Sequence, residues 1–472
     1  MDATTQETRF EDRMSDSDAL MWFIEYDPAL RSTIVTLSML DVAPDRERLL
    51  AKVDQATRVL PRLRQRVAVN PLSIAPPRWV ADPDFDLSFH VRFERLDEGA
   101  TLRDLLDFAQ PIAMEGLDRD RPLWQMRVVD GLEGGRAALV MKLHHSLSDG
   151  VGLVQMLSAL VELEREGHDG PAELPDVPPF RVMSIAERML DALGYERRKQ
   201  VSRVRRAWSF VAEGLSEAVR DPLAGAKGVM RAVSSVGHLL RPVSSPLSPL
   251  MTKRSTRIRM DVTTVDFREF KRAARDAGGT INDAFVAATA AGLRRYHETH
   301  GATPSRLRMT MPINLRSEGE AGTGGNHFVP VRFEVPIGSP DPADAMRTIG
   351  RLAREERDEP ALPVVDELAA LFTSFPAAVS ASILGSMLKG VDFLTSNVRG
   401  PSFPLYLAGG RILQMVGFGP LTGAAANLTM LSYDGTCSVG ISTDPAAIPD
   451  PDFFVECVVR GFEEVLRCER AA

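Results

Sequence analysis

The chain has 472 residues, of which 44% are hydrophobic and 25% charged, and this predicts a soluble globular protein of two or three domains. Its formal net charge of -8 argues against a general nucleic-acid-binding protein. The three cysteines are odd in number and lack CxxC spacing, which fits a reducing cytoplasm best.

No targeting segment is evident in the sequence. The first twenty residues are polar and mixed in charge, so we expect no secretory signal there. The longest uncharged run, residues 368–388, could span a bilayer on length alone. Because it contains Pro376, Gly385, four serines and a threonine, it favours a pair of buried or surface-lying helices over a spanning helix.

The N-terminal part, residues 1–166, alternates between helical and strand-like patterns. Apolar periodicity predicts a helix over residues 45–67, a strand over 136–145 and a closing helix over 150–166. This order is typical of a mixed α/β domain.

A connector over residues 167–255 follows, and a second mixed region covers 256–472. Proline, glycine and acidic residues mark the start of the connector. Residues 181–259 contain 16 Lys or Arg against 6 Asp or Glu, a net of +10, so the rest of the chain carries -18. The last region begins with a predicted strand over 257–267 and a helix over 280–298. We therefore expect two α/β lobes joined by a long basic connector.

The connector contains an amphipathic pattern between residues 195 and 219. Its apolar side chains recur at spacings of three and four, and basic side chains occupy the opposite side. Such a helix suits an anionic membrane surface, with the tryptophan at the interface. The alternative is a helix packed on the two lobes with solvated arginines. The candidate membrane-contact residues are Arg203, Arg205, Arg206 and Trp208.

Two adjacent histidines stand in "VMKLHHSLSDG", residues 140–150. Side chains alternate along a strand, so His145 shares a face with Leu143, and His144 points to the other face. This divergence disfavours a shared metal ion, which usually recruits histidines at helical spacing. The pair His297 and His300 is also outside HExxH spacing and predicts an exposed helix end.

His145 has two interpretations from the residues alone. It stands where the apolar face of the strand ends, so its imidazole should face an interior cleft and could accept a proton near neutral pH. The alternative is a hydrogen-bonded core histidine beside a helix cap, because Ser146 and Asp149 fit a helix start.

Motifs for other common chemistries are missing from the sequence. It has no GxSxG elbow, no Walker loop and no GxGxxG fingerprint. The glycine-rich residues 322–328 lack the lysine and the strand-to-helix setting of a phosphate loop, so we interpret them as a loop.

The "HHSLSDG" stretch resembles the HHxxxDG motif of the bacterial wax ester synthase/acyl-CoA:diacylglycerol acyltransferase family. That family is related to the HxxxD acyltransferases, which include chloramphenicol acetyltransferase. The resemblance covers about residues 14–160 and 256–465. Further matching segments, in order, are "MSDSDALMWFIE", "FDLSFHVR", "RPLW", "INDAF", "PINLR", "TSNVRGPSFPLYLAGGRI" and "SYDGTCSVGISTD". Two departures, Trp22-Phe23 and the glycine- and alanine-rich residues 414–430, bear on the acyl chain length and the alcohol class.

The resemblance implies two chloramphenicol acetyltransferase-like lobes with mixed sheets and a tunnel at their interface. It also implies transfer of a long-chain acyl group from acyl-CoA to diacylglycerol or to a long-chain alcohol, which yields triacylglycerol or wax ester. Acyl-CoA would be a cosubstrate, and no cofactor or metal is expected. Because acceptor and product are lipids, we expect a cytoplasmic protein associated peripherally with the inner membrane face or with lipid inclusions.

The resemblance also assigns roles to residues. His145 would be the general base, supported by His144, Asp149 and Gly150. Asp149 would turn away from the pocket and pair with an arginine, for which Arg316 and Arg399 are the candidates.

Two further motifs receive roles in the same way. Asn282 would donate to the oxyanion or form the tunnel wall, although Asn282 and Asp283 could simply cap their helix; Asp283 also stands in capping-box spacing with Thr280. Pro122, Leu123 and Trp124 match the PLW motif of the family. Trp124 is expected to be a core aromatic packed beneath the motif strand.

Two alternatives keep the same fold. The donor could be a carrier-protein thioester, or the chain could be a catalytically silent lipid-binding or inclusion-coating protein. An intact His145 argues against the second alternative. Between the two products, the arginine- and alanine-rich style resembles actinobacterial members and favours triacylglycerol.

Overall fold

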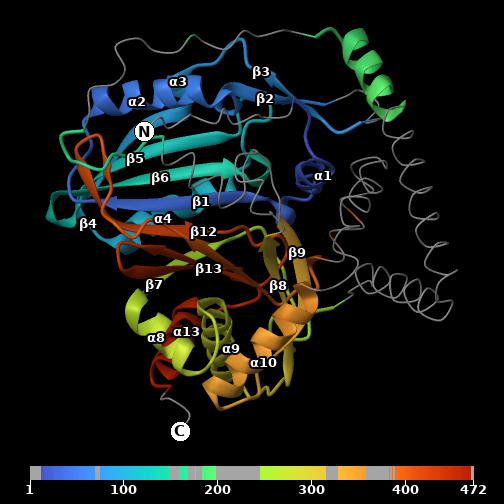
Figure 1. The fold of residues 1–472 in the computed structure, drawn as a ribbon, viewed down its shortest axis with the longest axis vertical. Helices are drawn as coiled ribbons and strands as arrows, with labels where there is room; N and C mark the ends of the chain where they lie inside the picture. The colour runs from blue at the N-terminus through green and yellow to red at the C-terminus, as the bar shows by residue number, and fades with distance from the viewer. Residues whose placement is uncertain are drawn as a thin grey trace, which may run out of the picture.

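Two mixed β-sheets form the frame of the protein in the computed structural model (Figure 1). The structure describes residues 12–69, 75–147, 159–167, 176, 183–197, 245–314, 328–357, 382, 385 and 388–468. Within these ranges each large sheet has six strands, and a separate pair is formed by β2 (Gln65–Ala68) and β3 (Arg78–Ala81). The predicted α/β class with two mixed sheets is therefore confirmed.

The first sheet has the order β11-β12-β1-β6-β5-β4. Its strands are β1 (Thr33–Leu40), β4 (Val91–Ala100), β5 (Trp124–Leu132), β6 (Arg136–His144), β11 (Tyr406–Leu407) and β12 (Gly410–Phe418). Strands β4 and β5 run parallel, and the other neighbours are antiparallel. The central strands β1 and β6 are buried on both faces, which explains their nearly continuous apolar sequences.

Helices of the N-terminal part cover both faces of this sheet. They are α1 (Asp16–Ile24), α2 (Arg46–Val59), α3 (Leu87–His90) and α4 (Leu102–Met114). Side chains of α1 and α2 pack in one hydrophobic cluster with one face of β1 and β6, and α4 packs in another cluster with the opposite face. The sheet is thus the middle layer between α2 and α4 (Figure 1).

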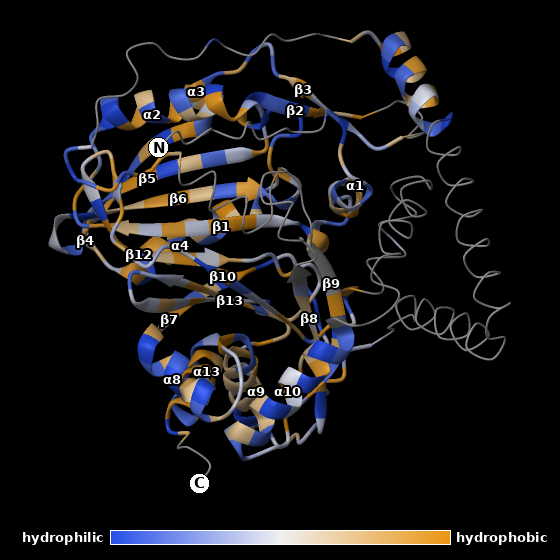
Figure 2. Cartoon of the chain, viewed as in Figure 1, coloured by the Kyte–Doolittle hydropathy of each residue, from blue (hydrophilic) through white to orange (hydrophobic). Residues whose placement is uncertain are grey.

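The second sheet has the order β7-β14-β13-β10-β8-β9. Its strands are β7 (Arg259–Asp266), β8 (Arg306–Asn314), β9 (Phe328–Pro336), β10 (Phe393–Arg399), β13 (Ala426–Tyr433) and β14 (Thr436–Thr443). Its helices are α8 (Phe267–Asp276), α9 (Ile281–Thr299), α10 (Pro342–Arg357) and α13 (Pro451–Leu466). These helices and strands share one hydrophobic cluster, and hydrophilic residues colour much of the visible surface of α8 and α10 (Figure 2).

The C-terminal half of the chain contributes strands to both sheets. Strand β12 pairs along β1, with Val35 opposite Phe418, and the chain then continues into β13 of the second sheet. The sheets meet closely there: a Cβ on Gly440 of β14 would lie 2.1 Å from the carbonyl oxygen of Gly417. Only glycine permits the backbones of β12 and β14 to approach so closely, and the two sheets therefore pack directly against each other at the end of β12.

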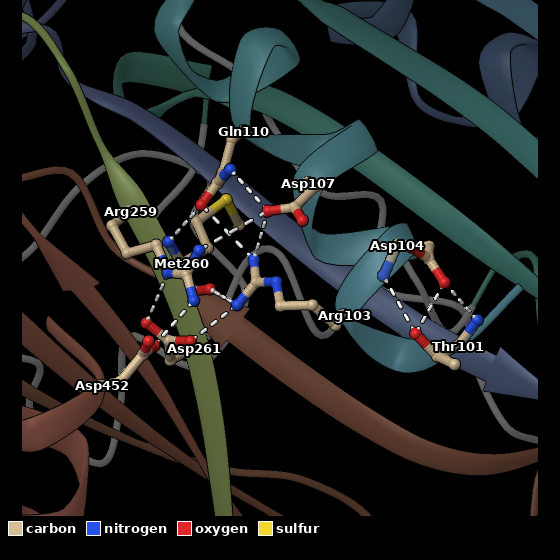
Figure 3. Close-up of polar contacts among 9 residues, drawn as sticks. All are labelled: Thr101, Arg103, Asp104, Asp107, Gln110, Arg259, Met260, Asp261 and Asp452. Atoms are coloured by element: carbon tan, nitrogen blue, oxygen red, sulfur yellow. Dashed lines mark hydrogen bonds and ion pairs between the residues drawn. The ribbon is translucent and has the colours of Figure 1, made fainter.

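A polar cluster joins the two sheets at a second place, between α4 and β7 (Figure 3). The Arg103 guanidinium donates to the Met260 carbonyl oxygen at 2.8 Å and to Asp261 Oδ1 at 2.6 Å. The Met260 N–H donates to Gln110 Oε1 at 2.9 Å, and Arg259 pairs with the other oxygen of Asp261 at 3.2 Å. Helix α4 is therefore tied to both sheets.

Several predicted elements are found with different ends. The helix predicted over 45–67 ends at Val59, because Pro61 starts a 3-10 turn and β2 follows. The helix predicted over 150–166 is wrong at its C-terminal end: residues 159–167 are not helical, and Glu162 forms a β-bridge with Tyr406. The strand predicted over 136–145 is confirmed as β6, and helix α9 starts one residue after Thr280.

Much of the connector lies outside the described residues, including Arg203, Arg205, Arg206 and Trp208. Residues 185–197 form a helix. Its Asp191 accepts from Arg78 at 2.8 Å and pairs with Arg13, so this helix is attached to the N-terminal part of the chain. The proposed division at 166 and 256 stays a prediction. No helix of the described part is long and apolar enough to cross a membrane, and most of 368–388 lies outside that part.

Candidate active site

His145 begins a short 3-10 turn directly after β6. Its N–H donates to the carbonyl oxygen of Ser32 at 2.7 Å, and the N–H of His144 donates to the carbonyl oxygen of Leu123 at 3.0 Å. The end of β6 is thus held between the residue that precedes β1 and the residue that precedes β5. This backbone pairing fixes where the His145 side chain points.

The His145 side chain lines a cavity of about 530 Å³, which we call the His145 cavity. Its wall is built by α1, β1, β8, β10, β12 and β13, so both sheets contribute. The apolar part of the wall comprises Leu20, Met21, Ile24, Ile34, Leu394, Val398, Leu405, Met415 and Leu431, among others. A largely apolar cavity of this size with a few polar groups is typical of a small-molecule site.

His144 lies outside this wall and is 1% exposed. Its Nδ1 accepts from the Ser146 N–H at 3.1 Å, so the proton of a neutral ring is on Nε2. Nε2 lies 3.1 Å from Glu25 Oε1, and the same oxygen accepts from the Ser32 N–H at 2.6 Å. Burial would raise the pKa of the Glu25 carboxyl, but His144, the Ser32 N–H and Arg119 outweigh it and hold that pKa below its ordinary value. His144 therefore braces the start of β1.

The PLW residues support the end of β6 from the other side. Pro122, Leu123 and Trp124 are buried, and Trp124 pairs with Leu143 across the strands. Trp124 Nε1 donates to the Leu63 carbonyl oxygen at 2.8 Å, and its ring stacks on the ring of His90 at 4.5 Å. Trp124 is thus placed in the core beneath the motif strand.

Asn282 and Asp283 lie in the first turn of α9. Thr280 is the N-cap, and its side chain and that of Asp283 form a capping box: the Thr280 N–H donates to Asp283 at 2.8 Å, and the Asp283 N–H donates to Thr280 at 3.2 Å. Asn282 is half-buried and is not among the residues that line the His145 cavity. Asn282 and His145 therefore do not line the same cavity.

Three residues of the predicted constellation lie outside the described part: Asp149, Gly150 and Arg316. Arg399, the other candidate partner of Asp149, is exposed at the C-terminal end of β10.

The sequence analysis missed the polar side chains of β13 in the cavity wall. Asn427 Nδ2 donates to the Pro420 carbonyl oxygen at 2.7 Å, and Thr429 Oγ1 donates to Asn427 Oδ1 at 3.1 Å. The Gly419 N–H in turn donates to Thr429 Oγ1 at 3.1 Å. Polar residues at every second position of a strand buried on both faces, in "AANLTM", were the signal that could have identified them.

The prediction for the second pair of histidines was partly wrong. His297 is fully buried, with Nδ1 2.8 Å from the Leu293 carbonyl oxygen and Nε2 2.7 Å from Ser248 Oγ. Helix α9 is covered by the segment around Ser248, which the helical pattern could not reveal. Among the described residues, no group of three or more His, Cys, Asp or Glu side chains could hold a metal ion.

Comparisons with known proteins agree with this architecture. The wax ester synthase/diacylglycerol acyltransferase catalytic domain matches residues 14–285, and the WS/DGAT C-terminal domain matches residues 324–465. A Mycobacterium tuberculosis protein named "Putative diacyglycerol O-acyltransferase Rv2484c" is 37% identical over 460 residues, which cover 97% of this chain and 92% of that protein.

Solved structures show the same fold. The wax ester synthase/diacylglycerol acyltransferase from Marinobacter aquaeolei VT8 superposes with a TM-score of 0.61 at 20% identity, covering 96% of this chain and 98% of that one. The first condensation domain of the calcium-dependent antibiotic synthetase gives 0.60 at 15% identity, with coverage of 99% and 98%. The resemblance seen in the motifs is confirmed, and the chain belongs to the wax ester synthase/diacylglycerol acyltransferase family of acyltransferases.

Proposed function

We propose that the chain transfers a long-chain fatty acyl group from acyl-CoA to diacylglycerol or to a long-chain alcohol, with His145 as general base. The observation that carries this proposal is the position of His145 in the wall of a large apolar cavity between the two sheets. A hydrocarbon chain is favoured in such a space because its transfer from water buries apolar surface. The preference for triacylglycerol over wax ester rests on family resemblance alone.

The proposed reaction is one direct displacement. The neutral His145 imidazole takes the hydroxyl proton while the alcohol oxygen attacks the thioester carbonyl carbon. The new C–O bond forms, the C–S bond breaks, and the imidazolium returns the proton to the departing thiolate. The products are an ester and free CoA. Because the apolar wall excludes water, the thioester would be protected from hydrolysis.

The developing oxyanion needs a hydrogen-bond donor. Asn282 is held at the start of α9 and does not line the His145 cavity, which weakens its candidacy. Asn427 lines the cavity, and its amide nitrogen carries a second hydrogen besides the one donated to Pro420. Thr429 fixes the amide by donating to its oxygen. We therefore propose Asn427 as the donor.

Peripheral association with a lipid surface is the second part of the proposal. The helix over 185–197 exposes Ile185, Leu190 and Leu193 to 60%, 70% and 52%. The chain that follows carries the basic residues Arg203, Arg205 and Arg206. Apolar and basic groups in succession favour binding to an anionic bilayer.

The experiment supplies purified protein with palmitoyl-CoA or palmitoyl-carrier protein, and with dioleoylglycerol or hexadecanol, and follows free thiol together with extracted ester. Ester made from palmitoyl-CoA supports the proposal and ranks the two alcohols. Turnover of the carrier-protein donor alone supports the first alternative. A folded protein that binds lipid and makes no ester with either donor supports the silent lipid-binding alternative.

A further inference from the structure

A half-buried arginine, Arg254, joins three segments that lie far apart in the sequence. Its Nε donates to the Gly423 carbonyl oxygen at 2.5 Å, and its Nη2 donates to the Val391 carbonyl oxygen at 2.9 Å. Its Nη1 donates to the carbonyl oxygens of Met251 and Lys253, at 2.7 and 2.8 Å, within its own segment. All three guanidinium nitrogens therefore donate to main-chain oxygens.

The two distant acceptors belong to the wall of the His145 cavity or lie beside it. Val391 lines the cavity, and Gly423 follows Thr422, which also lines it. We call residues 419–424, between β12 and β13, the cavity turn. Thr422 and Gly423 have φ angles of 45° and 85°. A residue other than glycine rarely adopts such an angle, and it does so where surrounding contacts hold the backbone in place.

The cavity turn packs closely against the residues that precede β10. A Cβ on Gly423 would lie 3.1 Å from Lys389 Cγ, 3.2 Å from the Lys389 nitrogen and 3.1 Å from Leu30 Cδ2. Arg254 donates to both of these segments, because Gly423 belongs to the turn and Val391 precedes β10. The arginine therefore fixes the turn against its neighbour.

The cavity turn in turn holds the proposed oxyanion donor. Asn427 Nδ2 donates to the Pro420 carbonyl oxygen at 2.7 Å, and the Gly419 N–H donates to Thr429 Oγ1 at 3.1 Å. Thr429 also donates to the amide oxygen of Asn427 at 3.1 Å. The direction of the second Asn427 N–H thus depends on where the turn lies. A misplacement of about 1 Å near a reacting group can cost on the order of 10²-fold in rate.

Arg254 is charged where it makes these bonds. Burial lowers the pKa of its guanidinium, whereas Asp392 and Asp444 favour the charged form, and an arginine remains protonated near neutral pH. Hydrogen bonds from a charged donor are roughly twice as strong as those from a neutral one. Methionine has a similar length but cannot donate, so Arg254→Met removes the hydrogen bonds to Gly423 and Val391.

We propose that Arg254 is a positioning residue for acyl transfer, because it holds the cavity turn where Asn427 can donate to the oxyanion. The inference rests on the proposed function, in which Asn427 is that donor. Arg254 is not among the described residues that line the His145 cavity, so it acts through the turn and not on the substrate. Its loss should therefore lower turnover through Asn427.

The test uses Arg254→Met, Arg254→Lys and a matched control, Arg308→Met. Arg308 is also half-buried, and its Nη1 donates to the carbonyl oxygens of Ser245 and Gly390 at 2.8 and 3.0 Å. Neither acceptor belongs to the cavity turn. Both methionine variants should lower the urea midpoint of unfolding, so every kcat is referred to the folded fraction.

The first measurement is a double-mutant cycle with Asn427→Ala, assayed with palmitoyl-CoA and hexadecanol. Arg254→Met should lower kcat by about 10- to 10²-fold with little change in KM, and Arg254→Lys should recover part of this loss. In the Asn427→Ala background the further loss from Arg254→Met should be less than about 2-fold, because both changes act on one group. Arg308→Met should leave kcat within about 2-fold in either background. Losses from Arg254→Met and Asn427→Ala that multiply in the double variant would overturn the inference.

The second measurement needs no turnover and so separates the inference from the proposed function. In protein labelled with ¹⁵N-asparagine, the side-chain amide signals of Asn427 are identified by their loss in Asn427→Ala. Arg254→Met should shift these signals, whereas Arg308→Met should leave them in place. Unchanged Asn427 signals in Arg254→Met would overturn the inference even if kcat falls. A wild type that makes no ester would contradict the proposed function, but a shift confined to Arg254→Met would still support Arg254 as the residue that places Asn427.

Discussion

His144 Nε2 lies 3.1 Å from Glu25 Oε1, whereas the neighbouring His145 lines the large apolar cavity. The two histidines are adjacent in sequence, but only His145 is among the residues that line the cavity. His144 Nδ1 accepts from Ser146 and its Nε2 faces Glu25, outside the residues that line that cavity. Replacing His144 should therefore mainly lower stability, whereas replacing His145 should mainly lower turnover.

Replacing His144 should cost stability more than turnover. His144→Ala leaves the buried Glu25 carboxylate without its partner, and we expect a loss of about 2–4 kcal/mol in the free energy of unfolding. The activity of the folded fraction should fall much less than in His145→Ala. Urea denaturation and the assay, both referred to the folded fraction, check this. Unchanged stability with complete inactivity would contradict the bracing role.

The contact between Glu25 and His144 also predicts that the free energy of unfolding depends on pH. The folded pKa of Glu25 is held below its ordinary value of 4.5, so its contribution to stability is fully present above about pH 4.5 and is lost as the pH falls through the folded pKa. Urea titrations between pH 7 and pH 3 measure it. In Glu25→Gln this part of the pH dependence should be absent; a curve that keeps the wild-type slope would refute the assignment.

His90 should cause a second change in stability, at higher pH than the change due to Glu25. Burial lowers its pKa below 6.5, although the Trp124 carbonyl oxygen at 2.8 Å and Asp82 act in the opposite direction. A histidine kept neutral in the folded state contributes stability that is present above about pH 6.5 and declines as the pH falls towards its folded pKa. We expect His90→Gln to flatten thermal stability between pH 7 and pH 5. A variant that keeps the wild-type slope over this range would contradict the role given to His90.

The proposed oxyanion donor can be tested against the rival asparagine. Asn427→Ala should lower kcat by about 10²–10³-fold, the usual effect of removing one such donor. Asn282→Ala should leave kcat within a few-fold, because Asn282 does not line the cavity. Thr429→Val keeps the shape and removes the hydroxyl that fixes Asn427, so an intermediate loss is expected. A larger loss of kcat in Asn282→Ala than in Asn427→Ala would instead identify Asn282 as the oxyanion donor.

The cluster between α4 and β7 should hold the lobes together. Burial raises the pKa of Asp261 even though Arg259 and Arg103 lower it, so removing one arginine leaves a poorly compensated charge. Arg103→Met should lower the free energy of unfolding by about 3 kcal/mol at pH 8, and by less at low pH, where Asp261 takes up a proton. The control is Arg95→Met, whose pair with Glu98 is exposed and should contribute less than about 1 kcal/mol.

The sequence was sufficient to predict features that depend on a few neighbouring residues. Alternation along β6 separated His144 from His145, and the spacing of Thr280 and Asp283 predicted the capping box of α9. Family motifs identified the family because they recur in order along most of the chain.

Long-range pairing was not readable from one sequence. Nothing in residues 410–418 indicates that β12 joins β1 in the first sheet, because the paired residues lie 372 to 383 positions apart, as in Leu40 with Ile412 and Val35 with Phe418. The alternation of Asn427 and Thr429 along β13 was readable, but the cavity that they line is formed only when both sheets come together.

The central claim is that His145 removes the proton of the alcohol. The most direct measurement compares wild type and His145→Ala with palmitoyl-CoA and dioleoylglycerol or hexadecanol, following thiol and ester together, with thermal unfolding and CoA binding as controls for the fold. We predict that the variant folds and binds CoA as the wild type does, while ester formation falls by about 10²–10⁴-fold. A folded variant that forms ester at the wild-type rate would contradict the account.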